Sequence, residues 1–329
     1  MREPGADRLP RDERSTQSRR RTVSERILVT GVLGCLGAWI ARLAVERGDH
    51  VVGFDLGDDR SRLALVLGAD EGRVELARGD ITDLDAIERA LDDHELTRVV
   101  HLAALQVPFV RANPSLGMRV NVQGTTNVFE AVSRRQERIP AVVYASSAAV
   151  FNAEDPNPAP EAGGTRPTTL YGVSKLADEG LARVYRSDRG LPSIGFRPYV
   201  VYGAGRDQGM TSGPTTAIAA ALRGEPATIA FSGEAQFDYA RDVAGAMLGA
   251  LEAQLDAAVV LNTAGIVATA EDFAAEIRSQ LPEAEIVIAG DRLPFPAALE
   301  AVGYERDIGP YPQTPLARGI AETIALFTA

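Results

Sequence analysis

The sequence predicts an α/β protein in which a doubly wound parallel sheet is followed by a smaller C-terminal unit. Up to residue 197, short apolar runs alternate with segments whose apolar residues recur at helical spacing. A continuous apolar run is typical of a strand buried on both faces, and strand–helix alternation favours parallel pairing. After about residue 203 the segments shorten and prolines and glycines become frequent, which indicates a second unit.

Six strands are expected because each segment is a short apolar run: 27–29, 50–54, 74–77, 98–102, 141–145 and 193–197. Helices are expected where apolar residues follow a helical period: 38–47, 84–91, 116–134 and 171–189. Because strands and helices alternate along the chain, helices should cover both faces of the sheet.

The composition excludes several classes of function. A formal net charge of −11 repels the phosphate backbone of a nucleic acid. The single cysteine, Cys35, excludes an internal disulfide and fits a cytoplasmic location. With three histidines in the chain, no Cys/His metal site is expected. No apolar run reaches the roughly 18–20 residues of a membrane span, so no membrane partner is expected.

The turn after the first strand has three glycines in the spacing of a dinucleotide-binding loop. Gly31 allows a tight turn, Gly34 lets the backbone approach a pyrophosphate, and Gly37 lets the helix pack closely on the strand. The helix start, with Cys35 and Leu36, offers free N–H groups to phosphates. We therefore expect a Rossmann-type sheet that binds a dinucleotide, the alternative being a glycine-rich surface loop.

Asp55 indicates which dinucleotide is bound. It lies 18 residues after Gly37 at the end of the second strand, where an acid hydrogen-bonds the adenosine ribose. A carboxylate there repels a 2′-phosphate, so we expect NAD rather than NADP. Arg60 and Arg62 lie nearby, and they either soften this preference or belong to a solvated loop. We interpret Cys35 as a packing residue without redox chemistry.

Tyr171 and Lys175 are the candidate catalytic pair. They are four residues apart in an expected helix, so both lie on one face. The pKa of a free phenol is about 10, and a nearby ammonium and a cationic nicotinamide both favour the phenolate. Tyr171 is then expected to take a hydroxyl proton while a hydride passes to NAD, and Lys175 to hold the nicotinamide ribose.

Ser147 is expected to complete this site. It follows the fifth strand and precedes Tyr171 by 24 residues, and its hydroxyl can hydrogen-bond the substrate oxygen. For Ser147 and its neighbour Ser146, the alternative is simple capping of the strand end.

Together these residues resemble the extended short-chain dehydrogenase/reductase family, also called the NAD-dependent epimerase/dehydratase family. The resemblance covers roughly residues 26–250. It rests on motifs in a specific order and spacing: Thr30-Gly-x-x-Gly-x-x-Gly37, Asp55, Gly79-Asp80-Ile81, His101-Leu102-Ala103-Ala104, Asn121-Val122-x-Gly124-Thr125-x-Asn127, Ser146-Ser147, Tyr171-x-x-x-Lys175 and Arg197-Pro198.

The resemblance implies further cofactor contacts. In enzymes of this family the acid that matches Asp80 contacts adenine, and the strand end that matches Leu102–Ala104 lines the cofactor. The full set of contacts implied in this way is Asp80, Ile81, Leu102, Ala103, Ala104, Asn121 and Pro198. His101 belongs to the same strand motif and is interpreted as structural.

Two departures from the family pattern reduce the number of activities that are expected. Dehydratases of the family usually have an Asp-Glu pair where this chain has Ala148-Ala149, so dehydration is not expected. Nucleotide-sugar enzymes commonly have an arginine that grips the diphosphate, and this chain has Ala235 there. Arg241 occupies a different motif position. A standard UDP-sugar is therefore disfavoured, unless Arg206 or Arg223 grips the diphosphate from another direction.

The loop over residues 202–214 is expected to lie over the cleft and to contact substrate. Its hydrogen-bonding side chains suit a polyhydroxylated or carboxylated small molecule, and the alternative is a flexible lid. The candidate substrate contacts are Gln106, Ser147, Arg206, Thr211 and Ser212.

Three functions follow from these observations. We expect an NAD-dependent oxidoreductase acting on a secondary alcohol or ketone of a sugar, sugar acid or polyol. The alternative, which the Ser-Ser-Ala-Ala-Val run favours, is an NAD-dependent sugar-nucleotide 4-epimerase with the same hydride chemistry. A regulatory dinucleotide-binding protein is disfavoured because Ser147, Tyr171 and Lys175 are all present.

Along the chain we expect a disordered polar extension at 1–24, an NAD-binding Rossmann domain at 25–203 and mainly a substrate-binding unit at 204–329. Enzymes of the resembled family are often dimers through two helices. We therefore expect a homodimer in which the helices over 116–134 and 171–189 form a four-helix bundle with those of a second copy.

Overall fold

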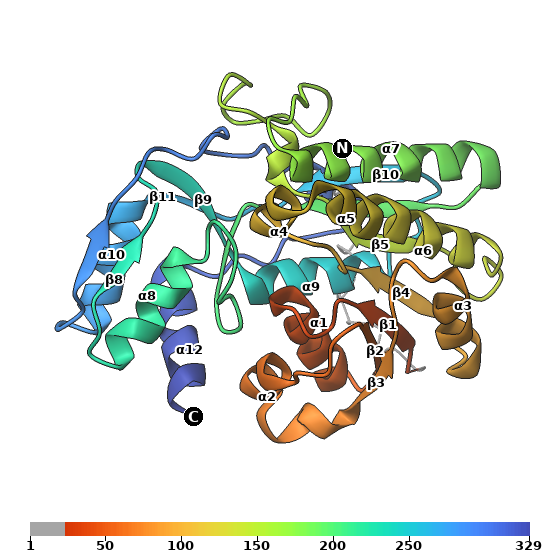
Figure 1. Cartoon of the computed structure of the whole chain (residues 1–329), viewed down its shortest axis with the longest axis horizontal. Coiled ribbons are helices and arrows are strands. Elements are labelled where there is room, and N and C mark those ends of the chain that lie inside the picture. Colours follow the sequence, from red (N-terminus) through yellow and green to blue (C-terminus); the bar gives the residue numbers. More distant parts are fainter. Residues whose placement is uncertain (1–23) are drawn as a thin grey trace, which may run out of the picture.

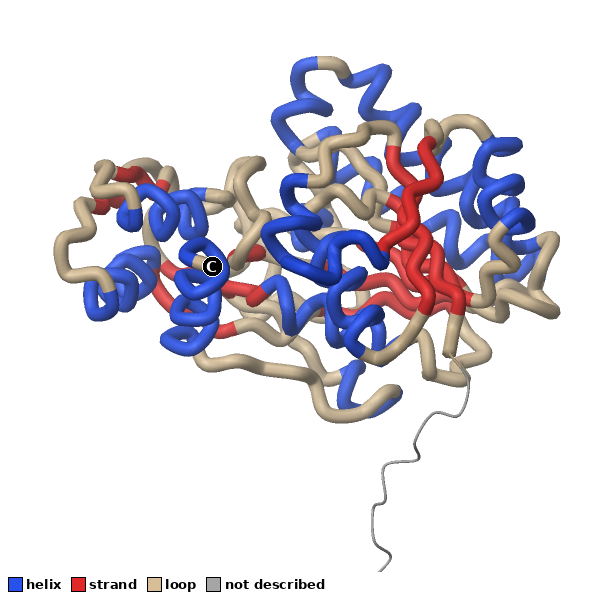
Figure 2. The backbone as a smooth tube through the Cα atoms, turned by 90° about the horizontal axis from the view of Figure 1, so that it is seen from below, coloured by secondary structure: helices blue, strands red, loops and turns tan. Residues whose placement is uncertain are grey.

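The structure, a computed structural model, describes residues 24–329, so the extension expected at 1–24 lies, apart from Ser24, outside it. Figure 1 shows a large sheet between two layers of helices, with a smaller unit at one end of the molecule. In Figure 2 the strands of the large sheet gather in one red bundle, and the C-terminus lies in the smaller unit, away from them.

The strands of the large sheet are β1 (Arg26–Thr30), β2 (His50–Asp55), β3 (Val74–Arg78), β4 (Arg98–His101), β5 (Val142–Ala145), β6 (Ser193–Arg197) and β10 (Ala258–Asn262). Within the described residues these seven strands run in the order β10-β6-β5-β4-β1-β2-β3, and all neighbours are parallel. The expected strands agree with the observed ones to within one residue at each end. The prediction of a doubly wound parallel sheet is confirmed.

Helices cover both faces because alternate side chains of a strand point to opposite sides. Ile27 and Val29 of β1 pack into one hydrophobic core with α1 (Cys35–Glu46), α2 (Ser61–Leu67) and α9 (Ala240–Ala250). Leu28, between them, packs into a second core with α3 (Leu84–Asp93), α6 (Gly124–Ser133) and α7 (Leu170–Arg189).

The order of the strands also predicts where a ligand binds. β1 and β4 are neighbours, and from them the chain proceeds toward opposite edges of the sheet. In open α/β sheets a crevice forms at the carboxyl ends of such a pair. Two short 3₁₀ helices, η1 (Gly68–Arg73) and η3 (Ala148–Val150), lie in connections beside the sheet, and η3 follows β5 directly.

The helix expected over 116–134 consists of three pieces: α5 (Pro114–Met118), the π-helix η2 (Arg119–Gln123) and α6, preceded by the short α4 (Val107–Ala112). A π-helical turn is wider than an α-helical turn and often marks a functional site. Asn121 lies in this turn, fully buried, and its carbonyl accepts a hydrogen bond from the Thr125 hydroxyl at 2.6 Å. The apolar period of the sequence continues through this turn, so it did not reveal the interruption.

The smaller unit contains a sheet of β7 (Val200–Tyr202), β9 (Glu234–Tyr239) and β11 (Ile266–Thr269), and a pair of β8 (Ala227–Ile229) and β12 (Ile286–Ile288). Its helices are α8 (Gly213–Leu222), α10 (Ala270–Gln280) and α12 (Leu316–Thr328). The short α11 (Gly303–Asp307) packs instead on the large sheet, where Tyr304 lies against Phe196 of β6 with ring centroids 6.1 Å apart.

The boundary expected between residues 203 and 204 divides the two sheets incompletely. β7 precedes it but pairs with β9, and β10 follows it but extends the large sheet beside β6. β10 joins the large sheet by pairing with β6, about 65 residues earlier in the chain. Local sequence patterns do not show which distant strand a segment pairs with. Among residues 24–329, no helix combines the length and the apolar character needed to span a bilayer.

Candidate active site

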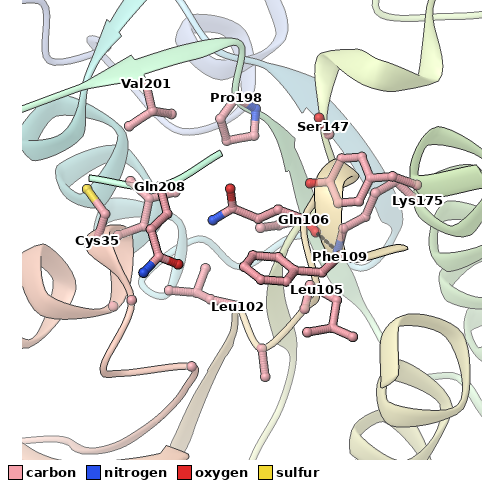
Figure 3. A pocket seen from close by; sticks show the side chains of 18 of the residues that line it. Cys35, Leu102, Leu105, Gln106, Phe109, Ser147, Lys175, Pro198, Val201 and Gln208 are labelled. Carbon is pink, nitrogen blue, oxygen red and sulfur yellow. Dashed lines mark hydrogen bonds between the residues drawn. The ribbon is translucent and has the colours of Figure 1, made fainter. Parts of the chain in front are cut away.

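A cleft of about 560 Å³ lies at the carboxyl ends of the large sheet's strands (Figure 3). The sequence-predicted residues that line it are Gly31, Gly34, Cys35, Leu36, Gly37, Asp55, Asp80, Ile81, Leu102, Ala103, Ala104, Gln106, Ser147, Tyr171, Lys175, Pro198, Arg206 and Thr211. Two predicted residues, Asn121 and Ser212, do not line it. Within residues 24–329, no group of three or more His, Cys, Asp or Glu residues could hold a metal ion.

The glycine-rich turn lies at one end of the cleft. Gly31 has φ +70°, and a Cβ there would lie 2.8 Å from the Ala103 nitrogen. A Cβ on Gly37 would lie 2.6 Å from the Cα of Val32, so neither position accepts a side chain without a backbone shift. Gly34 precedes α1 without a side-chain cap, so the first N–H groups of this helix remain available to a ligand. The helix begins at Cys35, earlier than expected, because glycines interrupt the apolar pattern there.

Asp55 ends β2 beside this turn. Its carboxylate accepts hydrogen bonds from the backbone nitrogens of Leu33, at 3.1 Å, and Gly57, at 3.3 Å. The neighbouring arginines both have acidic partners. Arg60 pairs with Glu71, and Arg62 pairs with Asp207 at 2.8 Å. Asp80 is held in a similar way, since the backbone and the hydroxyl of Thr82 both donate to it at 2.8 Å.

Cys35 lines the cleft as a packing residue. Its Sγ lies 3.7 Å from the Ala204 carbonyl oxygen, the acceptor that Trp39 also contacts. Burial raises the pKa of the Cys35 thiol to about 12, against the opposing charges of Arg206 and Arg62. The thiol is therefore protonated at neutral pH, and it is not poised for redox chemistry.

Tyr171, Lys175 and Ser147 line the same part of the cleft. The hydroxyl of Thr169 accepts from the nitrogen of Gly172, and this cap starts α7 next to Tyr171. Lys175 is 3% exposed, and its Nζ donates to the Ala145 carbonyl at 2.9 Å and to Asp178 at 3.3 Å. The ammonium is thus fixed at the end of β5, one helical turn from Tyr171.

The two serines after β5 have different environments. Ser147 Oγ accepts from the nitrogen of Ala149 at 3.1 Å and so caps η3, yet Ser147 also lines the cleft. Ser146 lines the cleft as well, but it is buried and its hydroxyl donates to Glu179 at 2.6 Å. Glu179 accepts two further hydrogen bonds from Arg197, both at 2.8 Å. This network connects β5, β6 and α7 beneath the cleft.

A chain of buried hydrogen bonds connects the glycine-rich turn to α6. Thr30 Oγ1 lies 2.7 Å from His101 Nδ1, and His101 Nε2 lies 3.0 Å from Thr125 Oγ1. Burial, assisted by the charge of Lys175, lowers the pKa of His101 to about 3, so its ring is neutral. Because Thr125 donates to the Asn121 carbonyl, we assign the Nε2–H tautomer to His101. The structural interpretation of His101 agrees with this placement.

Asn121 supports the wall of the cleft through hydrogen bonds without lining the cleft itself. Its side chain accepts from the nitrogen of Leu105 at 2.7 Å and donates to the carbonyl of Leu105 at 3.0 Å. It also donates to Ser174 at 3.0 Å, and Ser174 in turn donates to the Tyr171 carbonyl at 2.7 Å. Asn121 therefore holds the loop after β4 against the first turn of α7.

The opposite wall comes from the loop after β7. The guanidinium of Arg206 donates to Gln106 at 3.2 Å and to the Thr211 hydroxyl at 3.3 Å, and all three residues line the cleft. Ser212 instead donates to the Gly209 carbonyl at 3.0 Å inside its own loop. Its hydroxyl is used for the turn that starts α8, which explains its absence from the cleft.

Sequence reasoning missed the apolar lining of the cleft: Phe54, Leu56, Leu105, Val107, Phe109, Val120, Tyr199, Val201, Met210 and Phe295. Met210 lies within the loop over residues 202–214 that was expected to contact substrate, so its place in that loop could have identified it as a lining residue. Phe295 comes from the far C-terminal part of the chain and packs edge-on against Tyr199, with ring centroids 5.9 Å apart. Nothing local to residue 295 indicated this contact.

The arginines considered for a diphosphate take different positions. Ala235 is fully buried in β9 and does not line the cleft. Arg241 pairs with Glu322 of α12 at 3.1 Å, and Arg223 pairs with Glu225 at 2.7 Å. Of the arginines that sequence analysis considered for this role, only Arg206 lines the cleft.

Comparison with known proteins identifies similar sequences. Residues 27–263 match the NAD dependent epimerase/dehydratase family. Over 186 residues the chain is 34% identical to UDP-glucuronate 4-epimerase 2 of Arabidopsis thaliana. This alignment covers 54% of this chain and 42% of that protein. Over 184 residues it is 33% identical to D-erythronate dehydrogenase of Cupriavidus necator, covering 52% of this chain and 56% of that one. The match thus spans about half the length of these relatives.

A solved structure has the same fold over nearly the whole chain. MoeE5, in complex with UDP-glucuronic acid and NAD, superposes with a TM-score of 0.77 and 26% identity. The superposition covers 92% of this chain and 99% of that one.

Proposed function

This chain belongs to the NAD-dependent epimerase/dehydratase family, and from that premise we propose that it is an NAD-dependent oxidoreductase. It transfers a hydride between NAD and a secondary alcohol or ketone of a sugar-like substrate, and its preferred substrates are small sugar acids. The site residues proposed from the sequence keep their assigned roles, except that Asn121 acts as a support of the cleft wall and Ser212 as a turn residue.

The residues of the cleft fit NAD. The uncapped start of α1 offers N–H groups to a pyrophosphate, and the absence of side chains at Gly31 and Gly34 lets the backbone of the turn approach it. Asp55 presents a carboxylate to the adenosine ribose. Arg62, the described cation that lines the cleft near Asp55, is paired with Asp207, which supports NAD over NADP because its charge is not free to balance a 2′-phosphate.

The chain's own residues divide the chemistry. NAD, when bound, supplies the carbon that accepts the hydride. Tyr171 removes the hydroxyl proton of the alcohol as its C–H bond breaks, and returns a proton in the reverse direction. Ser147 donates to the same substrate oxygen, while the buried Lys175 keeps an N–H donor for the nicotinamide ribose. Leu105, Val107 and Phe109 give this end of the cleft an apolar wall.

The preference for an acid rests on Arg206. In the described part of the chain, three cations line the cleft, namely Arg62, Lys175 and Arg206. Arg62 and Lys175 have carboxylate partners, whereas Arg206 contacts the neutral groups of Gln106 and Thr211. Its Nε is buried without a hydrogen-bond partner among the described residues. A substrate carboxylate would satisfy this guanidinium, and the erythronate of a 33% identical relative is such an acid.

The alternative is a sugar-nucleotide 4-epimerase with the same hydride chemistry. The Ser146–Val150 run and the similarity to UDP-glucuronate 4-epimerase 2 favour it. Two observations oppose it. Ala235 is buried and has no charged group, and Arg241 is paired with Glu322, so neither residue is available to bind a diphosphate.

Incubation with NAD and a panel of sugar acids, free sugars, polyols and UDP-sugars tests the proposal. We expect NADH absorbance in stoichiometric yield with a sugar acid. A new UDP-sugar epimer in the NMR spectrum, without NADH, would establish the epimerase instead.

We further propose a homodimer through α7 and the helices beside it. Three apolar side chains of α7, Leu170, Val173 and Val184, are exposed in the single chain. Light scattering of the purified protein should give twice the chain mass, and the double substitution Val173→Glu with Val184→Glu should give a monomer. An unchanged mass would contradict this interface.

A further inference from the structure

Asp178 forms a buried ion pair with the lysine of the active site. Lys175 and Asp178 are three residues apart on α7, and their side chains are 4% and 1% exposed. The Nζ donates to the Asp178 carboxylate at 3.3 Å and to the Ala145 carbonyl at 2.9 Å. An ammonium has three N–H donors, so one is left for the cleft that Lys175 lines.

The titratable groups around this pair come from α7, β4, β5 and β6 and are Tyr171, Glu179, His101, Tyr144 and Arg197. Glu179 is already paired with Arg197. His101 is neutral because burial lowers its pKa to about 3, and burial raises the pKa of Tyr144 well above its usual range. Among the described residues, the charge of Lys175 is therefore balanced by Asp178.

An unbalanced ammonium would distinguish the two oxidation states of the cofactor. The nicotinamide ring of NAD+ is cationic, whereas that of NADH is neutral. In a buried site a single extra positive charge repels the first and has little effect on the second. The pair of Lys175 and Asp178 has no net charge, so it removes this bias while leaving one N–H donor for the ligand.

We infer that Asp178 is a positioning residue that fixes the Lys175 ammonium and cancels its charge beside the nicotinamide, so that the site binds NAD+ as well as NADH. This rests on the proposed function, because it takes the cleft to bind NAD with its nicotinamide next to Lys175. Asp178 itself does not line the cleft and acts through Lys175.

Dissociation constants of NAD+ and NADH, measured by calorimetry at pH 7.5 without substrate, test this inference. The proteins compared are the unaltered chain, Asp178→Asn, Asp178→Glu and the control Asp188→Asn. Asp188 lies on the same helix and is exposed, so its substitution removes an equal charge away from the pair. We expect Asp178→Asn to weaken NAD+ binding about tenfold and NADH binding less than twofold, the order of magnitude for one unbalanced charge.

Asp178→Glu should restore the ratio of the two constants, and Asp188→Asn should leave it unchanged. Equal weakening of NAD+ and NADH in Asp178→Asn would assign a purely structural role and overturn the inference, as would an unchanged ratio. If the unaltered protein binds neither form, the proposed function fails and the inference fails with it.

The pH dependence of the unaltered protein provides a second measurement that needs no variant. Burial raises the pKa of Asp178 to about 6, although Lys175 opposes this shift. Above pH 6 the carboxylate is charged and balances Lys175, and below it the balance is lost. NAD+ affinity should therefore fall relative to NADH affinity as the pH drops from 7.5 to 5.5. A flat ratio over this range would contradict the inference.

Discussion

The two ends of the cleft are built in different ways. At the end proposed to bind the cofactor, called the cofactor end, the lining residues follow directly from strands of one sheet, with Gly31 after β1, Asp55 at the end of β2 and Leu102 after β4. At the end proposed to bind the substrate, called the substrate end, Arg206 and Phe295 come from long connections in the second half of the chain. The topology of the sheet is sufficient to place the proposed cofactor contacts, whereas the position of the proposed substrate contacts depends on how the smaller unit packs against the sheet.

The ends also differ in charge. Asp55 and Asp80 line the cofactor end, and both are held by backbone N–H groups. The substrate end has Arg206, whose contacts are neutral. A carboxylate near the adenosine selects a ribose diol, and an unpaired guanidinium selects an anion. In the proposed function, cofactor binding and the choice of substrate therefore depend on separate parts of the cleft.

The largest expected effect comes from the residue where the two ends meet. Tyr171→Phe removes the acid–base group while keeping the ring, so turnover should fall about 10³-fold, within the range for general acid–base catalysis. NADH absorbance with the best substrate of the panel gives the rate, and calorimetry gives NAD affinity, which should remain unchanged. Turnover near that of the unaltered enzyme would break the catalytic assignment.

A smaller effect is expected at the cofactor end. Asp55→Asn removes the charge that repels a 2′-phosphate and weakens the contact with the ribose diol, so NAD should bind about tenfold more weakly relative to NADP. Dissociation constants for the two cofactors measure this change. Asp59→Asn, in the same loop but outside the cleft, is the matched control and should preserve the preference. An equal shift of the NAD/NADP preference in both variants would contradict a specific contact of Asp55 and would attribute the preference to the total negative charge of the loop.

The smallest effect is expected at Cys35. Its thiol is neutral, because burial raises its pKa to about 12, and it packs against the Ala204 carbonyl. Cys35→Ser should change kcat and KM by less than about twofold, as expected for a near-isosteric packing substitution. Steady-state kinetics provide the measurement. Loss of most activity would show that the thiol has a role beyond packing.

The sequence predicted the large sheet and most of the residues that line the cleft at the proposed cofactor end, because both depend on local patterns. The apolar run at 27–29 and the glycines after it define a strand and a turn within a dozen residues. Asn121 shows the limit of this reasoning. Its motif placed it beside the active site, but only the folded chain shows that its side chain holds Leu105 and Ser174.

The remainder of the site could not be predicted because its contacts join distant segments. Arg206 and Gln106 are 100 residues apart, and Phe295 packs on Tyr199 from the other half of the smaller unit. Asp178 was overlooked for another reason. An acid in a long amphipathic helix is usually exposed, and the sequence alone does not show that this one is 1% exposed beside Lys175.

The central claim, that Arg206 recognises a carboxylate, is tested most directly by the KM of one sugar acid and of the polyol with the same carbon chain, for the unaltered enzyme and for Arg206→Gln. A charge-assisted hydrogen bond contributes about 1.5–3 kcal/mol, so the substitution should raise the KM of the acid by about tenfold to hundredfold. The KM of the polyol and the affinity for NAD should stay within about twofold of their original values. Equal losses for acid and polyol, or a loss confined to NAD affinity, would contradict the claim.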